Sequence, residues 1–423
     1  MSTLFWPGGD GAGTVLSESA FLDAMVGVES AWLLAMIDVG VAPESAKHDL
    51  AGLVDSSDIP HVAAAAEAGG NPVIPLVALL RKRVESASPD AARWMHRGMT
   101  SQDVLDTALM LCARDALTQI EVQLSRQVRA LCELAERHRE TAMVGRTLTQ
   151  HAVPITFGAK AAAWLDGLLD AADTLTPVLA GLPAQFGGAA GTLSAATELA
   201  TVAGLDDPAG RALEVASRAA AALGLAHRLP WHGSRAPVTA VGHALCAGTS
   251  AWGRLANDVL TLTRPEIGEL AEPAAPGRGG SSAMPQKVNP VLSVLLRRAA
   301  LDGPARQLQL LTAAAEAHDE RPAGSWHLEW QALHLLGRHA VTAAHQATEL
   351  LEGLQVDEAR MAANLAGAGE GVLAEQRSIL GDVTPDNGAS IGVRDASDLI
   401  VTGTVERAER WSERRPVTAL RAQ

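Results

Sequence analysis

The sequence predicts an all-α protein built on a bundle of long helices. Apolar residues recur at spacings of three and four over most of the 423 residues. No run alternates with period two for long enough to build a sheet. Composition agrees with this, because hydrophobic residues make up 48% of the chain and aromatic residues only 3%. The bulk therefore comes from alanine and leucine, which are both strong helix formers.

The helical pattern can be followed segment by segment. In 21–39, apolar residues from Phe21 to Val39 lie on one helical face. Segment 101–140 contains no proline or glycine, and Ser101 or Asp103 is expected to cap its start. Its apolar stripe consists of Leu105, Leu109, Cys112, Ala116, Ile120, Leu124, Val128 and Leu131. Further helices are expected at about 155–181, 208–227, 238–263, 290–318 and 326–354.

The length favours more than one domain. Breaks near 85–100 and 353–357 predict three: an N-terminal helical domain at 1–95, a central long-helix bundle at 96–354, and a small C-terminal helical domain at 355–423. Long helices with such wide apolar faces need partners on several sides. We therefore expect an oligomer whose subunits share a helical core.

Charge and cysteine content limit the possible partners and compartment. The net charge of -14 argues against nucleic acid or an anionic membrane as partner. Cys112, Cys132 and Cys246 are scattered in apolar helical patterns and are expected to be buried thiols in a reducing compartment. The N-terminus lacks the pattern of a signal peptide, and no stretch approaches the apolar length needed to span a bilayer. A cytoplasmic location is expected.

The most informative segment is 280–290, which reads GSSAMPQKVNP. Glycines precede it and exclude regular structure, and Pro290 opens an apolar run as proline does at the first turn of a helix. Lys287 and Asn289 would then lie just before a helix N-terminus, where backbone N–H groups favour negative charge. The loop could bind a carboxylate and supply the hydroxyl of Ser281 or Ser282 for proton transfer. A glycine-rich connector is the alternative.

Two other polar segments interrupt the helices. Segment 96–103 ends at the start of the longest helix, where Thr100 and Ser101 would suit a carboxylate or simply cap the helix. In segment 145–154, Arg146 can clamp a carboxylate, Gln150 can donate to an oxygen, and His151 can move protons near neutral pH. The alternative for this second segment is a helix-breaking turn with exposed polar groups.

Two further polar segments are weaker candidates for a functional site. Segment 231–235, which ends in Arg235, could be an interhelical turn with a cap. The acids and imidazole of 318–321 are adjacent and face different directions on a helix, so no metal site is expected. The sequence has no GxSxG elbow, no HExxH pair, and no strand before its glycine pair that would indicate a dinucleotide turn.

The run GSSAMPQKVNP resembles the signature loop GSSxMPxKxNP of the aspartase/fumarase superfamily at every fixed position. The other two polar segments also match, and the resemblance covers roughly 90–330. TSQDVLDTA, RTLTQHAVPITFG and AQFGGAAGTL are most similar to the bacterial 3-carboxy-cis,cis-muconate cycloisomerases. Leu148 stands where adenylosuccinate lyases carry histidine, which argues against a purine-pathway lyase. Met99 and the segment 391–397 depart from the family pattern.

The resemblance implies a three-domain fold and a homotetramer whose sites each draw on three subunits. It implies lactonisation of 3-carboxy-cis,cis-muconate, a small polycarboxylate, to 4-carboxymuconolactone in protocatechuate (β-ketoadipate) degradation, without cofactor or metal. The alternative is a fumarate-releasing lyase acting on nitrosuccinate, adenylosuccinate, argininosuccinate or another succinate derivative. A non-catalytic protein on the same fold is a further rival.

The resemblance also assigns roles to individual residues. Ser281 would carry the proton at carbon, with Ser282 as the other possibility, and Lys287 would stabilise the alkoxide and the aci-carboxylate. His151 would assist proton transfer or only bind. The residues expected to bind substrate are Thr100, Ser101, Arg146, Gln150, Arg235, Ser282, Met284 and Asn289.

Overall fold

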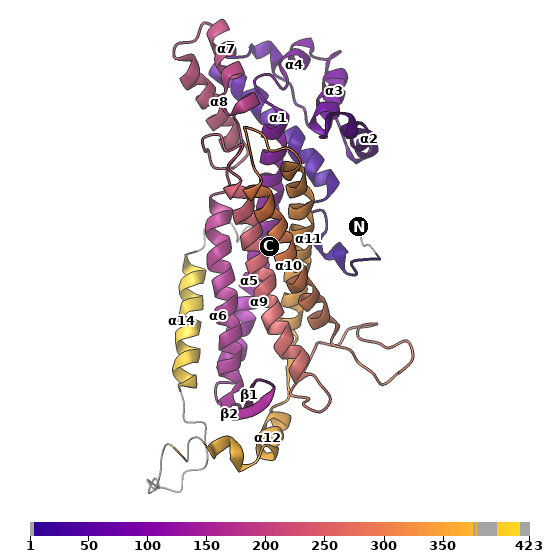
Figure 1. The fold of residues 1–423 in the computed structure, drawn as a ribbon, viewed down its shortest axis with the longest axis vertical. Helices are drawn as coiled ribbons and strands as arrows, with labels where there is room; N and C mark the ends of the chain where they lie inside the picture. The colour runs from indigo at the N-terminus through magenta and orange to yellow at the C-terminus, as the bar shows by residue number, and fades with distance from the viewer. Residues whose placement is uncertain (1–3, 375–377, 379–395, 415–423) are drawn as a thin grey trace. The chain divides into compact units, whose positions relative to one another are not determined.

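The structure is a computed structural model that describes residues 4–374, 378 and 396–414 (Figure 1). Helices dominate it, which confirms the all-α prediction. The chain divides into two compact units: unit 1 comprises Met1–Gln119, Leu175–Leu245 and Pro304–Val341, and unit 2 comprises Ile120–Thr174, Cys246–Gly303 and Thr342–Gln423. The three domains expected from the sequence remain a prediction.

Five long helices have residues in both units. They are α5 (Ser101–Arg137), α6 (Phe157–Ala180), α9 (Ala236–Leu262), α10 (Val291–Ala315) and α11 (Ser325–Glu352). Each lies within a few residues of a helix predicted from apolar spacing. Every residue of the predicted α5 stripe, from Leu105 to Leu131, is buried. The stripe is the face that a long amphipathic helix must cover with other helices.

Unit 1 carries most of the shorter helices. They are α1 (Glu18–Val39), α2 (Ile59–Gly69), α3 (Val73–Val84), α4 (Pro89–Trp94), α7 (Ser194–Val202) and α8 (Pro208–Ala222). The side chain of Ser17 caps α1 by accepting a hydrogen bond from the N–H of Ala20, and α1 ends at Gly40 in the left-handed conformation. Helices α7 and α8 pack together, and α8 also packs on α1 (Figure 1).

Unit 2 contains two small sheets and the C-terminal helices. Strands β1 (Ala142–Thr147) and β2 (Gln150–Thr156) form an antiparallel hairpin, and β3 (Leu270–Ala271) pairs with β4 (Gln355–Val356). Helix α12 (Glu358–Gly367) lies against β1, and the 3-10 helix η5 (Glu370–Leu373) follows it (Figure 1). Helix α14 (Ser397–Glu413) is fixed to α6 because Arg407 pairs with Asp166, Asp170 and Asp173. Most of segment 391–397, which departs from the family pattern, lies outside the described residues.

The hairpin corrects the sequence-based view of 145–154 as a loop between helices. The turn residues Leu148 and Thr149 both have positive φ, 49° and 70°. Tight hairpin turns of this kind usually contain glycine or asparagine, so the sequence lacked the expected turn signal. Non-glycine residues in this conformation are strained, and such strain is concentrated at functional sites.

Two other expectations also change. Helix α1 is long and apolar enough to cross a membrane by length and composition, which contradicts the statement that no stretch approaches a span. Most of α1 is buried inside the structure, as in the core helix of a soluble protein. All three cysteines are free, but only Cys112 is buried, whereas Cys132 and Cys246 are partly exposed.

Close packing of α9 on α10 in unit 2 gives a stability prediction. A Cβ added at Gly253 would collide with the Cβ of Ala300, whereas a Cβ at the exposed helical Gly403 would meet nothing within 4 Å. Gly253→Ala should lower the free energy of unfolding by about 1–3 kcal/mol through overpacking. Gly403→Ala should raise it by about 0.5–1 kcal/mol through helix propensity. Denaturant unfolding of both variants checks this, and equal changes of the same sign would contradict it.

Candidate active site

The first polar segment is held by a carboxylate at the start of α5. Asp103 accepts a hydrogen bond from the N–H of Thr100 at 3.0 Å, so Asp103 caps the helix. The same carboxylate accepts from the N–H groups of Gly187 at 2.9 Å and Gly188 at 3.0 Å. Asp103 therefore ties the Thr100 segment to the glycine-rich turn that contains the 3-10 helix η4 (Gly188–Ala190).

Asp103 and the two side chains nearest to its carboxylate, Gln185 and His232, are buried. Gln185 donates to it at 3.3 Å, and Nε2 of His232 lies 3.6 Å from it without a hydrogen bond. Burial raises the pKa of Asp103 to about 7, against the effect of its N–H donors. Burial also lowers the pKa of His232. Asp103 and His232 thus form a buried acid–base contact next to Thr100.

Arg235 is fully engaged within unit 1. Its guanidinium donates to Asp106 at 2.8 and 3.0 Å and to Glu329 at 2.6 to 3.1 Å. A further bond goes to the carbonyl oxygen of His232 at 3.0 Å. Arg235 is only 2% exposed. The sequence assigned it to a substrate carboxylate, but in this structure all of its nitrogens bind inside the protein.

Arg321 was missed as a site residue by the sequence analysis. It is exposed and donates to Oγ1 of Thr100 at 2.5 Å and to Oε1 of Gln102 at 3.3 Å. Both acceptors are neutral, and no acid among the described residues forms an ion pair with Arg321. Its charge therefore remains available beside Thr100. The sequence offered one signal, an arginine ending the polar run 318–321, which was considered only as part of a metal site.

The hairpin carries the second set of candidates. Arg146 forms a bidentate pair with the buried carboxylate of Glu269, at 2.8 and 2.9 Å. Asn364 also donates to Glu269 at 2.8 Å. Arg146 was predicted to clamp a substrate carboxylate, but in the structure its bidentate contact is with the internal acid Glu269. Gln150 and His151 are exposed at the start of β2, so their side chains can reach a ligand.

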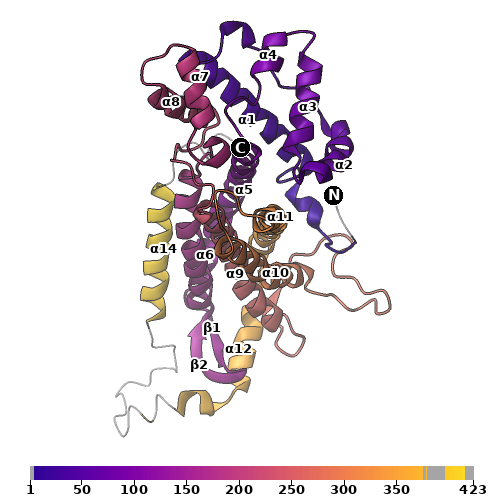
Figure 2. The same ribbon diagram turned by 45° about the horizontal axis from the view of Figure 1, so that its top comes forward.

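The third segment is the loop between β3 and α10, which projects from the helices in both views (Figures 1 and 2). Oγ of Ser281 accepts hydrogen bonds from the N–H groups of Met284 at 3.1 Å and Ala283 at 3.4 Å. Backbone donors aimed at a hydroxyl oxygen favour its alkoxide form. Ser282 and Lys287 are exposed on the same loop.

The N-terminus of α10 differs from the expectation that it would bind substrate. Glu272, next to β3, accepts from the N–H of Leu292 at 2.9 Å and from the N–H and Oγ of Ser293 at 2.7 and 2.6 Å. An internal carboxylate therefore fills this position. Asn289, whose side chain was expected to bind substrate, donates from Nδ2 to the carbonyl oxygen of Gly279 at 3.0 Å.

The structure thus joins Thr100 with Arg321 in unit 1. In unit 2 it places Arg146, Gln150 and His151 on one hairpin and Ser281 to Asn289 on one loop. Among the residues described for unit 2, no hydrogen bond joins the side chains of Gln150 or His151 to that loop. Within the described ranges, no group of three or more His, Cys, Asp or Glu is placed to hold a metal ion.

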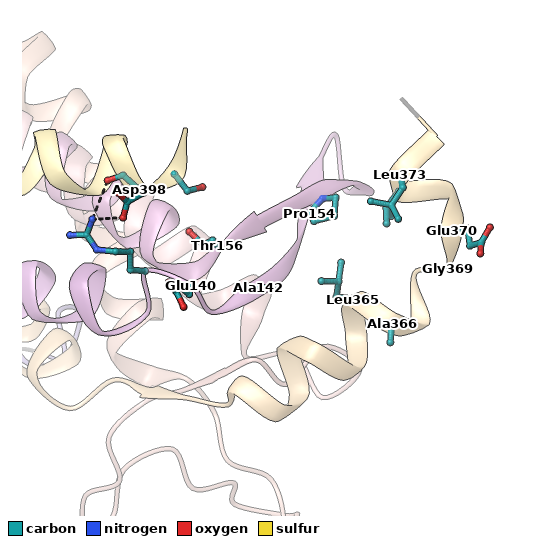
Figure 3. Close-up of a pocket in the computed structure, with 13 residues that line it drawn as sticks. Glu140, Ala142, Pro154, Thr156, Leu365, Ala366, Gly369, Glu370, Leu373 and Asp398 are labelled. Atoms are coloured by element: carbon teal, nitrogen blue, oxygen red, sulfur yellow. Dashed lines mark hydrogen bonds and ion pairs between the residues drawn. The ribbon is translucent and has the colours of Figure 1, made fainter. Parts of the chain in front are cut away.

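A separate pocket of about 660 Å³ lies in unit 2 between the hairpin, α12 and the start of α14 (Figure 3). Its acids are Glu140, Glu370 and Asp398, and its arginine, Arg139, already pairs with Asp398 at 2.6 Å. None of the predicted site residues lines it. Its arginine is already paired, so the described lining offers a polycarboxylate no unpaired cation.

Comparison with known proteins agrees with the three motifs. The family model described as Lyase matches residues 63–302. Nitrosuccinate lyase of Streptomyces davaonensis is 44% identical over 402 residues, 93% of this chain and 82% of that protein. A 3-carboxy-cis,cis-muconate cycloisomerase of Bradyrhizobium diazoefficiens is 37% identical over 406 residues, 95% of this chain and 86% of that protein.

Solved structures show the same relationship. The 3-carboxy-cis,cis-muconate lactonizing enzyme of Pseudomonas putida superposes with a TM-score of 0.80 at 30% identity, covering 95% of this chain and 97% of that one. A fumarate lyase of Mesorhizobium sp. gives a TM-score of 0.76 at 30% identity, covering 98% and 89%. Motifs, fold and relatives agree, and the chain belongs to the aspartase/fumarase superfamily of lyases.

Proposed function

We propose that this protein eliminates nitrite from 2-nitrosuccinate and releases fumarate. The observation that carries this proposal is the charge balance of the candidate site. Of its four cationic side chains, Arg146 and Arg235 are neutralised by buried internal acids. Arg321 and Lys287 remain, which matches a substrate with two carboxylates and a neutral third group.

Sequence similarity supports the same order of candidates. The nitrosuccinate lyase is 44% identical, whereas the cycloisomerases of Bradyrhizobium diazoefficiens and Pseudomonas aeruginosa are 37% and 39% identical. From the sequence alone, the cycloisomerase ranks first and the fumarate-releasing lyase second. The charge balance and the relatives together reverse that order.

The proposed reaction needs one base and one stabilised intermediate. Ser281, as the alkoxide, removes a proton from the methylene carbon, and the electron pair of the broken C–H bond is delocalised into the adjacent carboxylate. As the electrons of the resulting aci-carboxylate return to form the C=C bond, the C–N bond breaks. Nitrite leaves with the electron pair of that bond, and fumarate remains. The products are fumarate, nitrite and one proton.

The structure favours Ser281 over Ser282 as the base. A serine hydroxyl is a weak base unless its environment stabilises the alkoxide. Oγ of Ser281 accepts two backbone N–H groups, from Ala283 and Met284. In this proposal Lys287 supplies positive charge to the alkoxide and the aci-carboxylate. Thr100 and Arg321 hold the other carboxylate, because the arginine is already directed at the Thr100 hydroxyl.

Apart from Met284, whose thioether donates no hydrogen bond, the remaining predicted ligands suit the nitro group and the outer carboxylate oxygens. Gln150 and His151 are exposed donors on the hairpin. Ser101 is the first residue of α5, beside Thr100, and Met284 is 44% exposed on the Ser281 loop. A nitro group accepts hydrogen bonds but carries no net charge, so neutral donors are sufficient for it.

The cycloisomerase remains the second candidate. The similarity of TSQDVLDTA and AQFGGAAGTL to those enzymes favours it, as does the TM-score of 0.80 to the Pseudomonas putida lactonizing enzyme. Its substrate has three carboxylates and would need a third cation. Arg146 could supply this charge only by leaving Glu269.

We also propose a homotetramer whose active sites are shared between subunits. On α10, Val294, Leu301 and Leu308 recur every seven residues and are 50%, 71% and 63% exposed. A seven-residue apolar repeat is the pattern of a helix that packs on another helix. At the tip of the hairpin, Leu148 is 95% exposed. Both surfaces would be buried if the subunits assemble through their long helices.

The reaction can be tested with the two substrates in parallel. Purified protein incubated with 2-nitrosuccinate should release nitrite and fumarate in a 1:1 ratio, as measured by a colorimetric nitrite assay and by ultraviolet absorbance. With 3-carboxy-cis,cis-muconate, kcat/KM should be lower by at least about tenfold, corresponding to ~1.4 kcal/mol. Faster consumption of the muconate, with a lactone as product, would reverse the assignment.

Paired serine variants test the base. Ser281→Ala should lower kcat by about 10²–10⁴-fold, the usual contribution of a positioned acid or base. Ser282→Ala should lower it far less, because no backbone donor in the described part of the chain supports that hydroxyl. Arg321→Ala is the contrast, since loss of a carboxylate ligand should act mainly on KM. Steady-state kinetics on folded protein decides, and a Ser281→Ala enzyme with wild-type kcat would rule out this role.

The assembly can be tested on α10. Leu301→Lys should dissociate the tetramer and abolish activity, because a charge in an apolar helix contact is costly. Leu229→Lys is the control, since Leu229 is 67% exposed but lies outside the long helices. Analytical ultracentrifugation and activity should change together in the first variant only. An active monomer, from the wild type or the variant, would contradict shared sites.

A further inference from the structure

Glu272 lies at the point where the Ser281 loop leaves the helical unit. It follows β3 directly, is partly buried, and reaches across the base of the loop to the first residues of α10. Its carboxylate accepts three hydrogen bonds there, from the N–H of Leu292 and from the N–H and Oγ of Ser293. The distances, 2.6 to 2.9 Å, are those of strong charge-assisted bonds.

These contacts close the loop at its base. The chain leaves at Glu272 and returns at Leu292 and Ser293, so one side chain joins the two ends. A second cross-link lies further out, where the backbone N–H and Nδ2 of Asn289 both donate to the carbonyl oxygen of Gly279, at 2.8 and 3.0 Å. Arg278 of the loop also pairs with Glu349 of α11 at 2.6 Å. Between Gly280 and Val288 the described contacts are the tight turns that contain Ser281 and Lys287.

The same short stretch also fixes the hairpin. Glu269, three residues before Glu272, binds Arg146 of β1 and Asn364 of α12. The strand β3 between the two glutamates pairs with β4. The segment 269–272 therefore ties the start of the loop to a fixed part of unit 2. The hydrogen bonds of Glu272 to Leu292 and Ser293 then hold the end of the loop against its start.

We infer that Glu272 is a positioning residue for the Ser281 loop, and this inference rests on the proposed function. Its carboxylate binds the first residues of α10. It acts by fixing the loop ends, and thereby the place of the Ser281 hydroxyl and the Lys287 ammonium. Displacement of a catalytic group by about 1 Å can cost about 10²-fold in rate.

The alternative is that Glu272 only caps α10. The two roles predict different effects of a Glu272 variant on stability, kcat and loop accessibility. A cap that only stabilises α10 would lower stability and leave kcat of the folded enzyme unchanged. A positioning residue should change kcat with little change in KM, and it should change the accessibility of the loop. Loop accessibility can be measured without a substrate.

The test compares Glu272→Ala with Glu272→Gln and with the control Glu266→Ala, an exposed glutamate whose side chain makes no described contact. In Glu272→Ala, kcat should fall about 10- to 100-fold with KM within about threefold. In Glu272→Gln, kcat should recover at least about threefold relative to Glu272→Ala, because the amide oxygen can still accept from Ser293. The control should match wild type.

Limited trypsin digestion at Lys287 supplies the second readout. Cleavage after Lys287 should be at least about threefold faster in Glu272→Ala than in the control, under conditions where both are folded. Unchanged cleavage, or kcat within twofold of wild type, would overturn the inference. If wild-type protein fails to convert either substrate, the proposed function fails, and the cleavage rates still decide whether Glu272 fixes the loop.

Discussion

An arginine with little solvent exposure needs an acidic partner. In this protein internal carboxylates are those partners, and they lie near the ends of the long helices. Arg235 is held by Asp106 and Glu329 in unit 1, and Arg146 is held by Glu269 in unit 2. An uncompensated charge in such places would cost several kcal/mol, so removal of one partner is far more damaging than the modest net value of the pair suggests. The architecture around the candidate site depends on these pairs being complete.

Charge pairing also bears on the proposed substrate. The sequence contains arginines at the positions where a polycarboxylate enzyme would be expected to use them, but pairing removes two of them from the charge balance. What remains is Arg321 beside Thr100, and Lys287 on the loop. The chain has a net charge of -14, so every uncommitted cation counts in attracting a dianion. In the proposed function, a dicarboxylate with a neutral nitro substituent fits this balance better than a tricarboxylate.

Periodicity was sufficient to predict the long helices, because their apolar stripes extend over many turns and continue to the helix ends. The hairpin was not predicted, since its strands are short and its turn is Leu148–Thr149, without glycine or asparagine. The three polar segments and the cap by Asp103 were predicted from residue types, but the distant carboxylates that pair with Arg146 and Arg235 were not. Asp106 lies 129 residues from Arg235, and nothing in a local pattern indicates that distant pairing. Arg321 was missed for the same reason, because only its contact with the distant Thr100 marks it as a site residue.

The Ser281 loop shows why residue types alone do not decide a mechanism. From the sequence, the N-terminus of α10 was the natural source of stabilisation for an anion. In the structure Glu272 occupies that N-terminus. In our proposal the helix end therefore fixes the loop, and the chemistry falls to other donors. Those donors are the N–H groups of the turn after Ser281, which point at its Oγ. Backbone donors held in a turn need no reorganisation when charge develops, which is the property that makes such groups effective in catalysis. In the proposed mechanism the helix end thus supplies rigidity, while the turn and Lys287 supply the electrostatic stabilisation.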